Sequence, residues 1–84
     1  MESVKVLESR HVMSLLVFLR DKGPTNKMDI YETVARGPNM SEKLEVLESR
    51  GILRMEKSGK TIVSLTETGE QVADHLKAVM SLMV

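Results

Sequence analysis

A chain of 84 residues without cysteine has room for one modest hydrophobic core, and it excludes a disulfide framework and a thiolate metal site. Twelve basic and twelve acidic residues give no net charge, so the chain lacks the basic excess usual in nucleic-acid-binding proteins. We expect a single domain over residues 1–84 in the reducing cytoplasm, with no signal peptide and no membrane span.

The charges are unevenly distributed along the chain. Between Arg50 and Lys60 there are four basic residues and one acidic residue, whereas from Glu67 onward three acidic residues oppose one lysine. Only Phe18 and Tyr31 are aromatic, which argues against a stacking platform for single-stranded nucleic acid. A polyanion would therefore be attracted mainly to residues 50–60.

The first half of the chain predicts helices separated by glycine and proline. Residues 1–8 suit either an extension of the next helix or a short strand. Residues 11–22 are apolar on more than one face, which predicts a helix buried on two sides, with Ser9 as a candidate N-cap and Gly23-Pro24 as the stop.

A second helix is predicted to begin at Asn26 and to end at Gly37-Pro38. The residues expected to face inward are Met28, Ile30, Tyr31 and Val34.

A third helix is predicted for residues 39–50, with Asn39 and Glu42 as a capping pair. Its apolar stripe consists of Met40, Leu44 and Leu47. Gly51 is expected to end it, with Ile52 packing back on Leu47.

The pattern then changes from helical to alternating, which predicts a β-hairpin. Ser58-Gly59 is the expected two-residue turn, flanked by Lys57 and Lys60. Thr66 or Thr68 then caps a last helix. Its apolar stripe is Val72, Leu76, Val79, Met80 and Met83.

Two short motifs resemble those of winged helix-turn-helix transcription regulators of the MarR-like and PadR-like families. Residues 47–53, Leu-Glu-Ser-Arg-Gly-Ile-Leu, are similar to the exit from the recognition helix in those families. Residues 65–69, Leu-Thr-Glu-Thr-Gly, are similar to the link between the wing and the next helix. The fold class that this resemblance implies is mainly α with a small β-hairpin: a three-helix core, a two-stranded wing and a long C-terminal helix.

The resemblance implies a homodimeric regulator that binds double-stranded DNA, with the third helix in the major groove and the wing on the backbone. The residues expected on the reading face of the third helix are Asn39, Ser41, Glu42, Lys43 and Val46. Those expected on the DNA backbone are Lys27, Arg36, Arg54, Lys57, Ser58, Gly59 and Lys60. A small-molecule effector is common in these families, but the sequence locates no pocket for one.

Residues 66–84 are the expected dimerisation helix, because a domain of this size cannot bury all of its apolar surface alone. The expected interface residues are Val12, Leu16, Leu76, Val79, Met80 and Met83.

The outer face of the third helix departs from this interpretation because it carries Glu42 and Glu45, which repel a polyanion. Glu42 either closes a capping box with Asn39 or accepts a hydrogen bond from cytosine. The alternative function is a winged-helix protein-protein interaction module that docks through this acidic helix.

No catalytic function is predicted. His11 and His75 belong to separate helices without a carboxylate at ligand spacing, so we expect no metal, and no phosphate loop or nucleophile motif is present. No cofactor is expected.

Overall fold

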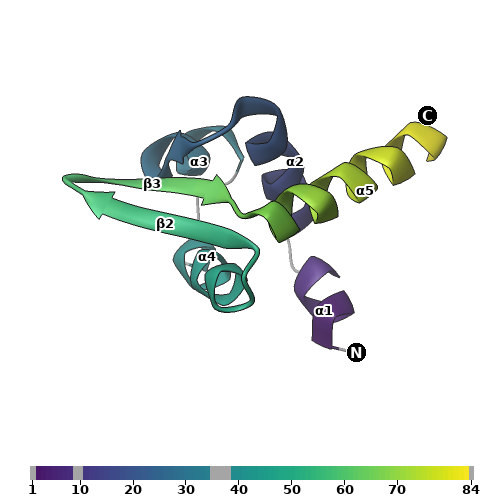
Figure 1. Ribbon diagram of the computed structural model, residues 1–84, viewed down its shortest axis with the longest axis horizontal. Helices are drawn as coiled ribbons and strands as arrows, with labels where there is room; N and C mark the ends of the chain where they lie inside the picture. Colours follow the sequence, from purple (N-terminus) through teal and green to yellow (C-terminus); the bar gives the residue numbers. More distant parts are fainter. Residues whose placement is uncertain (1, 9–10, 35–38, 84) are drawn as a thin grey trace.

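The structure is a computed structural model that describes residues 2–8, 11–34 and 39–83. Its elements, in chain order, are α1 (Glu2–Glu8), α2 (Val12–Lys22), β1 (Thr25–Asn26), α3 (Lys27–Thr33), α4 (Met40–Ser49), β2 (Leu53–Ser58), β3 (Lys60–Leu65) and α5 (Glu67–Met83). The hairpin of β2 and β3 and the far end of α5 project from opposite ends of the molecule (Figure 1). The winged helix fold predicted from the sequence is confirmed. No helix in the described ranges is long and apolar enough to cross a membrane.

The core lies between α2, α3, α4, the sheet and the first half of α5, which contributes Ala73. Leu15 and Leu16 of α2 and Leu44 of α4 are completely inaccessible to solvent, as are Ile30 of α3 and Val63 of β3. The predicted stripe of the third helix is confirmed, since all of its residues, Met40, Leu44 and Leu47, are buried. Burying these side chains is the main source of stability for so small a domain.

The sheet has three strands rather than the two predicted, in the order β1-β3-β2. The additional strand is formed by Thr25 and Asn26, which pair antiparallel with Val63 and Ile62. A two-residue strand shows no alternation in sequence, so pattern alone cannot predict it. The strand forms because the two residues just before α3 run alongside the side of β3 that β2 leaves unpaired and pair with it.

The hairpin turn differs from the expected two-residue Ser58-Gly59 turn, which would pair Lys57 with Lys60. The observed register pairs Lys57 with Thr61 and Ser58 with Lys60, so Gly59 alone forms the tip.

The N-terminal segment forms α1, a helix distinct from α2 rather than an extension of it or a strand. His11 interrupts the helical path with a φ of 70°, and its side chain does not cap α2. The predicted cap of this helix, Ser9, lies outside the described residues, as does the predicted Gly37-Pro38 stop of the next helix. Gly23 ends α2 as predicted, with a φ of 85° and its N–H donating to the carbonyl of Leu19.

The predicted cap of α3 is confirmed, because the Asn26 side chain accepts a hydrogen bond from the N–H of Met28 at 2.9 Å. The prediction that Met28 faces inward is wrong, since its side chain is 56% exposed. Met28 lies in the first turn of the helix, outside the core, whereas Ile30, two residues later, is buried in it.

The end of α4 has the geometry predicted for Gly51 and Ile52. The N–H of Ile52 donates to the carbonyl of Leu47 at 3.0 Å, and the N–H of Gly51 donates to that of Glu48 at 3.0 Å. This is the Schellman arrangement, which requires a residue with positive φ, and Gly51 has a φ of 75°. The chain is thereby turned from α4 directly into β2.

The start of α5 is fastened to this same turn. Thr66, rather than Thr68, caps the helix, since its Oγ1 accepts a hydrogen bond from the N–H of Gly69 at 3.0 Å and donates to the carbonyl of Gly51. A Cβ atom on Gly69 would lie 2.1 Å from the carbonyl oxygen of Ile52, so only glycine fits there. The two motifs that carry the family resemblance therefore meet in one junction, which we call the wing-α5 junction (Gly51, Ile52, Thr66 and Gly69).

Candidate nucleic-acid interface

The face of α4 opposite the core is open to solvent. Glu42, Glu45, Val46 and Ser49 are exposed, with 42% of the Val46 surface accessible. At 3.6 residues per turn these positions lie opposite the stripe of Met40, Leu44 and Leu47. We call these four residues the outer face of α4.

Four of the five predicted reading residues lie together. Asn39, Glu42, Lys43 and Val46 line a groove of about 260 Å³ beside α4. Val6 of α1 and Val12 of α2 also line this groove. A carboxylate, an amide and an apolar side chain are thus accessible from one side of the helix.

The fifth predicted reading residue, Ser41, points elsewhere. Its Oγ lies 2.6 Å from the hydroxyl of Tyr31, and both side chains are partly buried between α3 and α4. The Nζ of Lys27 lies over the Tyr31 ring, 5.8 Å from its centroid. Ser41 therefore helps to fix the angle between the two helices, and Lys27 covers this contact from the start of α3.

Capping does not explain the presence of Glu42. The Asn39 side chain forms no capping hydrogen bond, because Asn39 has helical dihedral angles of −91° and −5° that do not suit a cap. The predicted capping pair is therefore wrong. Within the described ranges no hydrogen bond or ion pair involves Glu42.

Glu48, in contrast, has a structural role. Its carboxylate accepts a hydrogen bond from the N–H of Met55 at 3.1 Å. β2 is an edge strand, so this N–H has no partner within the sheet. Glu48 satisfies it and ties α4 to the wing, which the sequence pattern alone does not indicate.

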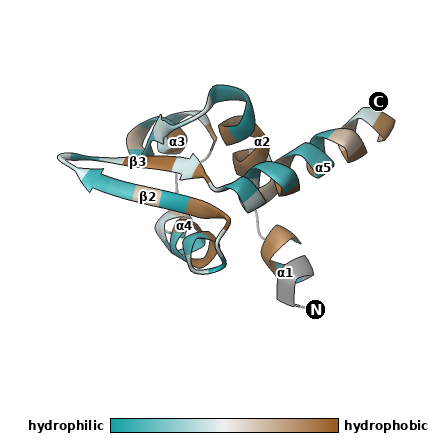
Figure 2. Ribbon diagram, in the orientation of Figure 1, coloured by the Kyte–Doolittle hydropathy of each residue, from teal (hydrophilic) through white to brown (hydrophobic). Residues whose placement is uncertain are grey.

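The predicted wing residues are exposed on the hairpin. Arg54, Lys57, Ser58, Gly59 and Lys60 are all accessible, and β2 becomes hydrophilic towards the tip (Figure 2). The register places Lys57 on the face of Leu53 and Met55, and Lys60 on the opposite face with Arg54. The ribbon therefore presents positive charge in both directions. Arg36, the remaining predicted backbone contact, lies outside the described residues.

A second surface lies on the other side of the molecule, between α2 and α5. A groove of about 500 Å³ is lined by Met13, Ser14, Val17, Phe18, Leu76, Val79, Met80 and Met83. We call this the α2–α5 groove. The sequence pattern predicted that α2 is buried on two sides but did not indicate which of its residues line this groove.

The prediction that Val12 and Leu16 belong to a dimer interface is wrong. Their exposed fractions are 1% and 0%, because they face the core of their own chain. The apolar positions of α2 divide between two faces. One face joins the core cluster with residues of α3, α4 and the sheet, and Met13 and Val17 line the α2–α5 groove.

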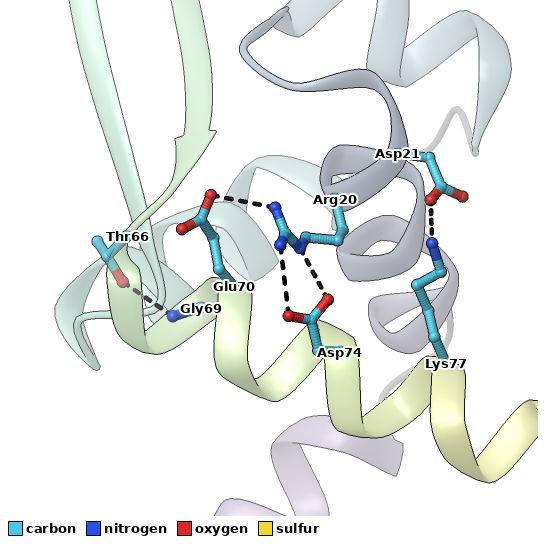
Figure 3. Close-up of polar contacts among 7 residues, drawn as sticks. All are labelled: Arg20, Asp21, Thr66, Gly69, Glu70, Asp74 and Lys77. Atoms are coloured by element: carbon cyan, nitrogen blue, oxygen red, sulfur yellow. Dashed lines mark hydrogen bonds and ion pairs between the residues drawn. The ribbon is translucent and has the colours of Figure 1, made fainter.

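Ion pairs hold α5 against α2 on the exposed side (Figure 3). Arg20 donates from Nε to Asp74 at 2.8 Å and from a terminal nitrogen to Glu70 at 3.3 Å, and Lys77 pairs with Asp21. The hydrogen bond between Arg20 and Asp74 lowers the pKa of Asp74 and raises the pKa of Arg20. These ion pairs connect the exposed sides of α2 and α5.

Among the described residues no group of three or more histidine or acidic side chains is placed to hold a metal ion.

Neither a protein-family model nor a curated protein matches this sequence. Among solved structures, a putative transcriptional regulator, ytfH from Salmonella typhimurium, is 28% identical with a TM-score of 0.84, over 98% of this chain and 78% of that one. A transcriptional regulator homologue from Pyrococcus horikoshii OT3 is 19% identical with a TM-score of 0.74, over 99% and 94%. AbfR, in a structure described as bound to DNA, is 18% identical with a TM-score of 0.73, and this chain covers 65% of it. The chain thus has the winged helix fold found in transcriptional regulators.

Proposed function

We propose that this protein is a transcription regulator of the MarR-like or PadR-like kind that binds double-stranded DNA as a homodimer, with α4 in the major groove and the hairpin on the backbone. The observation that carries the proposal is an exposed α4 face together with a projecting basic hairpin, on a fold shared with transcriptional regulators. One of the similar structures, AbfR, is bound to DNA.

Lys57 and Lys60 are the groups through which the hairpin would hold phosphate. Each lysine that contacts a phosphate releases about one counterion, so affinity falls with salt in proportion to the number of contacts. Replacing both by alanine is expected to weaken binding to duplexes of any sequence. The slope of log affinity against log salt should fall in magnitude by about 2.

The experiment is a fluorescence anisotropy titration on mixed-sequence duplex DNA at several salt concentrations. Lys22→Ala is the control, since it removes a positive charge from the last turn of α2, which is not part of the hairpin. An unchanged slope in Lys57→Ala/Lys60→Ala refutes the role of the hairpin. Absence of even non-specific binding by the wild type refutes DNA binding and favours the alternative, protein docking through the acidic outer face of α4.

The α2–α5 groove supports the homodimer. The last turns of α5 expose Val79, Leu82 and Met83 where the helix extends past α2, and Leu82 is 87% exposed. A twofold axis beside the groove would lay the projecting end of each α5 against the groove of its partner, burying both apolar surfaces at once. Residues 66–84 are therefore proposed as the dimerisation segment of a one-domain chain.

Sedimentation equilibrium tests this proposal with Val79→Asp, which places a charge within the groove and is expected to yield monomers. Met28→Asp is the control, because Met28 is equally exposed but lies on α3, away from the groove. A wild-type monomer at micromolar concentration, or a dimer that tolerates Val79→Asp, contradicts this interface.

A further inference from the structure

The outer face of α4 contributes two side chains, Glu42 and Val46, to the groove beside it. Glu42 is exposed, and in the described part of the chain it takes part in no hydrogen bond or ion pair. Val46, one turn further along, is an exposed β-branched side chain at the edge of the same groove. By contrast Ser41 and Glu48, on the flank of α4, are engaged by α3 and β2.

A carboxylate can only accept hydrogen bonds at neutral pH. In the major groove the donors on base edges are the exocyclic amines of cytosine and adenine. On adenine the amine lies beside the N7 acceptor, which repels a carboxylate, whereas cytosine presents the donor alone. Glu42 therefore matches cytosine among the four bases.

An aliphatic side chain reads a different feature of the groove. The C5 methyl of thymine is the apolar group that the major groove presents, and it makes favourable contacts with small apolar side chains. Val46 follows Glu42 by four residues, which corresponds to about 6 Å along the helix axis at ~1.5 Å per residue. Successive base pairs are separated by about 3.4 Å, so the two side chains reach bases one or two steps apart.

We propose that α4 reads each half-site through a cytosine bound by Glu42 and a thymine contacted by Val46, one or two base pairs apart. This inference rests on the proposed function and specifies its DNA sequence. The two carboxylates of the outer face lower the affinity for all DNA, and the hydrogen bond to cytosine recovers part of that loss only at the correct site. Glu42 is then a specificity determinant rather than a source of affinity.

The experiment is selection of bound fragments from randomised duplexes by the full chain, followed by competition titrations on single-base variants of the selected site. The wild type is expected to select cytosine and thymine at the stated spacing, with a preference of roughly 5- to 100-fold for cytosine over adenine. Glu42→Gln is expected to change the preferred base at that position to adenine, which glutamine contacts through N6 and N7. Val46→Ala is expected to reduce the thymine preference several-fold and leave the cytosine preference intact.

Glu45→Gln is the matched control, because it removes an exposed carboxylate from the same face of α4. It is expected to raise affinity on all sequences without changing the preferred bases. If Glu42→Gln does the same, the Glu42 carboxylate is only a repulsive charge and this inference is overturned, while the proposed function stands. If the wild type binds no duplex at low salt, the proposed function fails and this inference fails with it. Circular dichroism of each variant verifies that the helix content is retained.

Discussion

The two ends of α5 are built in opposite ways. At its start Thr66 caps the helix, Gly69 lies against the backbone of Ile52, and Ala73 is completely buried. At its other end Val79 and Met83 are exposed, and the helix extends beyond the body of the domain (Figure 1). The start of α5 is therefore fixed by contacts within the chain. Its far end has apolar side chains that no other part of the described chain covers.

The residues at the start of α5 therefore stabilise the fold, whereas those at its far end are available for binding. Substitutions at the wing-α5 junction should act on the free energy of unfolding. Substitutions at the far end should act on association. Four predictions test that division, from the largest expected effect on stability to the smallest.

Gly69→Ala is expected to have the largest effect. The added Cβ would lie 2.1 Å from the Ile52 carbonyl oxygen, which belongs to the backbone of a fixed turn and cannot rotate away. We expect the free energy of unfolding to fall by about 2–3 kcal/mol, despite the better helix propensity of alanine. Urea denaturation followed by circular dichroism measures the change. Thr68→Ala, at the exposed neighbouring position, should stay within about 0.5 kcal/mol, and equal effects of both variants would contradict the close approach.

Thr66→Ala is expected to lower the free energy of unfolding by about 1–2 kcal/mol. It removes the acceptor for the Gly69 N–H and the donor to the Gly51 carbonyl in one change. Thr66→Ser keeps the hydroxyl and should retain most of the stability, again measured by urea denaturation. A Thr66→Ser variant as unstable as Thr66→Ala would assign the effect to the lost methyl group instead.

Part of the fold, including the Gly51 end of the wing-α5 junction, could be predicted from the sequence. The hairpin strands, the core stripe of α4 and the Gly51 exit follow from local periodicity and local turn chemistry, and the structure contains all of them. β1 was not predicted because its partner strand, β3, is distant in sequence, and the hydrogen bond from Met55 to Glu48 was not predicted because it depends on how α4 packs beside β2. Local pattern carries no information about such partners.

The candidate site was predicted less completely than the fold, for a related reason. Helical periodicity placed Glu42 and Val46 outward, and both are exposed. It could not show that the Ser41 hydroxyl bonds to Tyr31, or that the two apolar sides of α2 divide between the core and the α2–α5 groove. An apolar position in sequence does not reveal which neighbour covers it. Val12 and Leu16 were therefore assigned to the wrong surface.

Met83→Lys tests the far end of α5. Because Met83 is 81% exposed, the free energy of unfolding at low protein concentration should change by no more than about 0.5 kcal/mol. The wild-type Tm should rise with protein concentration, because a dimer is stabilised by mass action, and Met83→Lys should abolish that dependence. Calorimetry over a hundredfold concentration range provides the measurement. A wild-type Tm independent of concentration would contradict the assignment of this end to association.

The exposed ion pairs between α2 and α5 are expected to contribute least, and their contribution should depend on pH and salt. The hydrogen bond from Arg20 lowers the pKa of Asp74 in the folded protein, so folding favours the ionised carboxylate. The resulting stability is present above the ordinary aspartate pKa of about 3.9 and is lost as the pH falls through the lower folded value. Asp74→Asn should therefore reduce the urea midpoint slightly at neutral pH, and this difference from the wild type should shrink below about pH 4 and in high salt. A difference that persists at low pH would mean that Asp74 acts through packing or helix propensity. The direction of α5 would then be set by the buried contact of Ala73 rather than by charge.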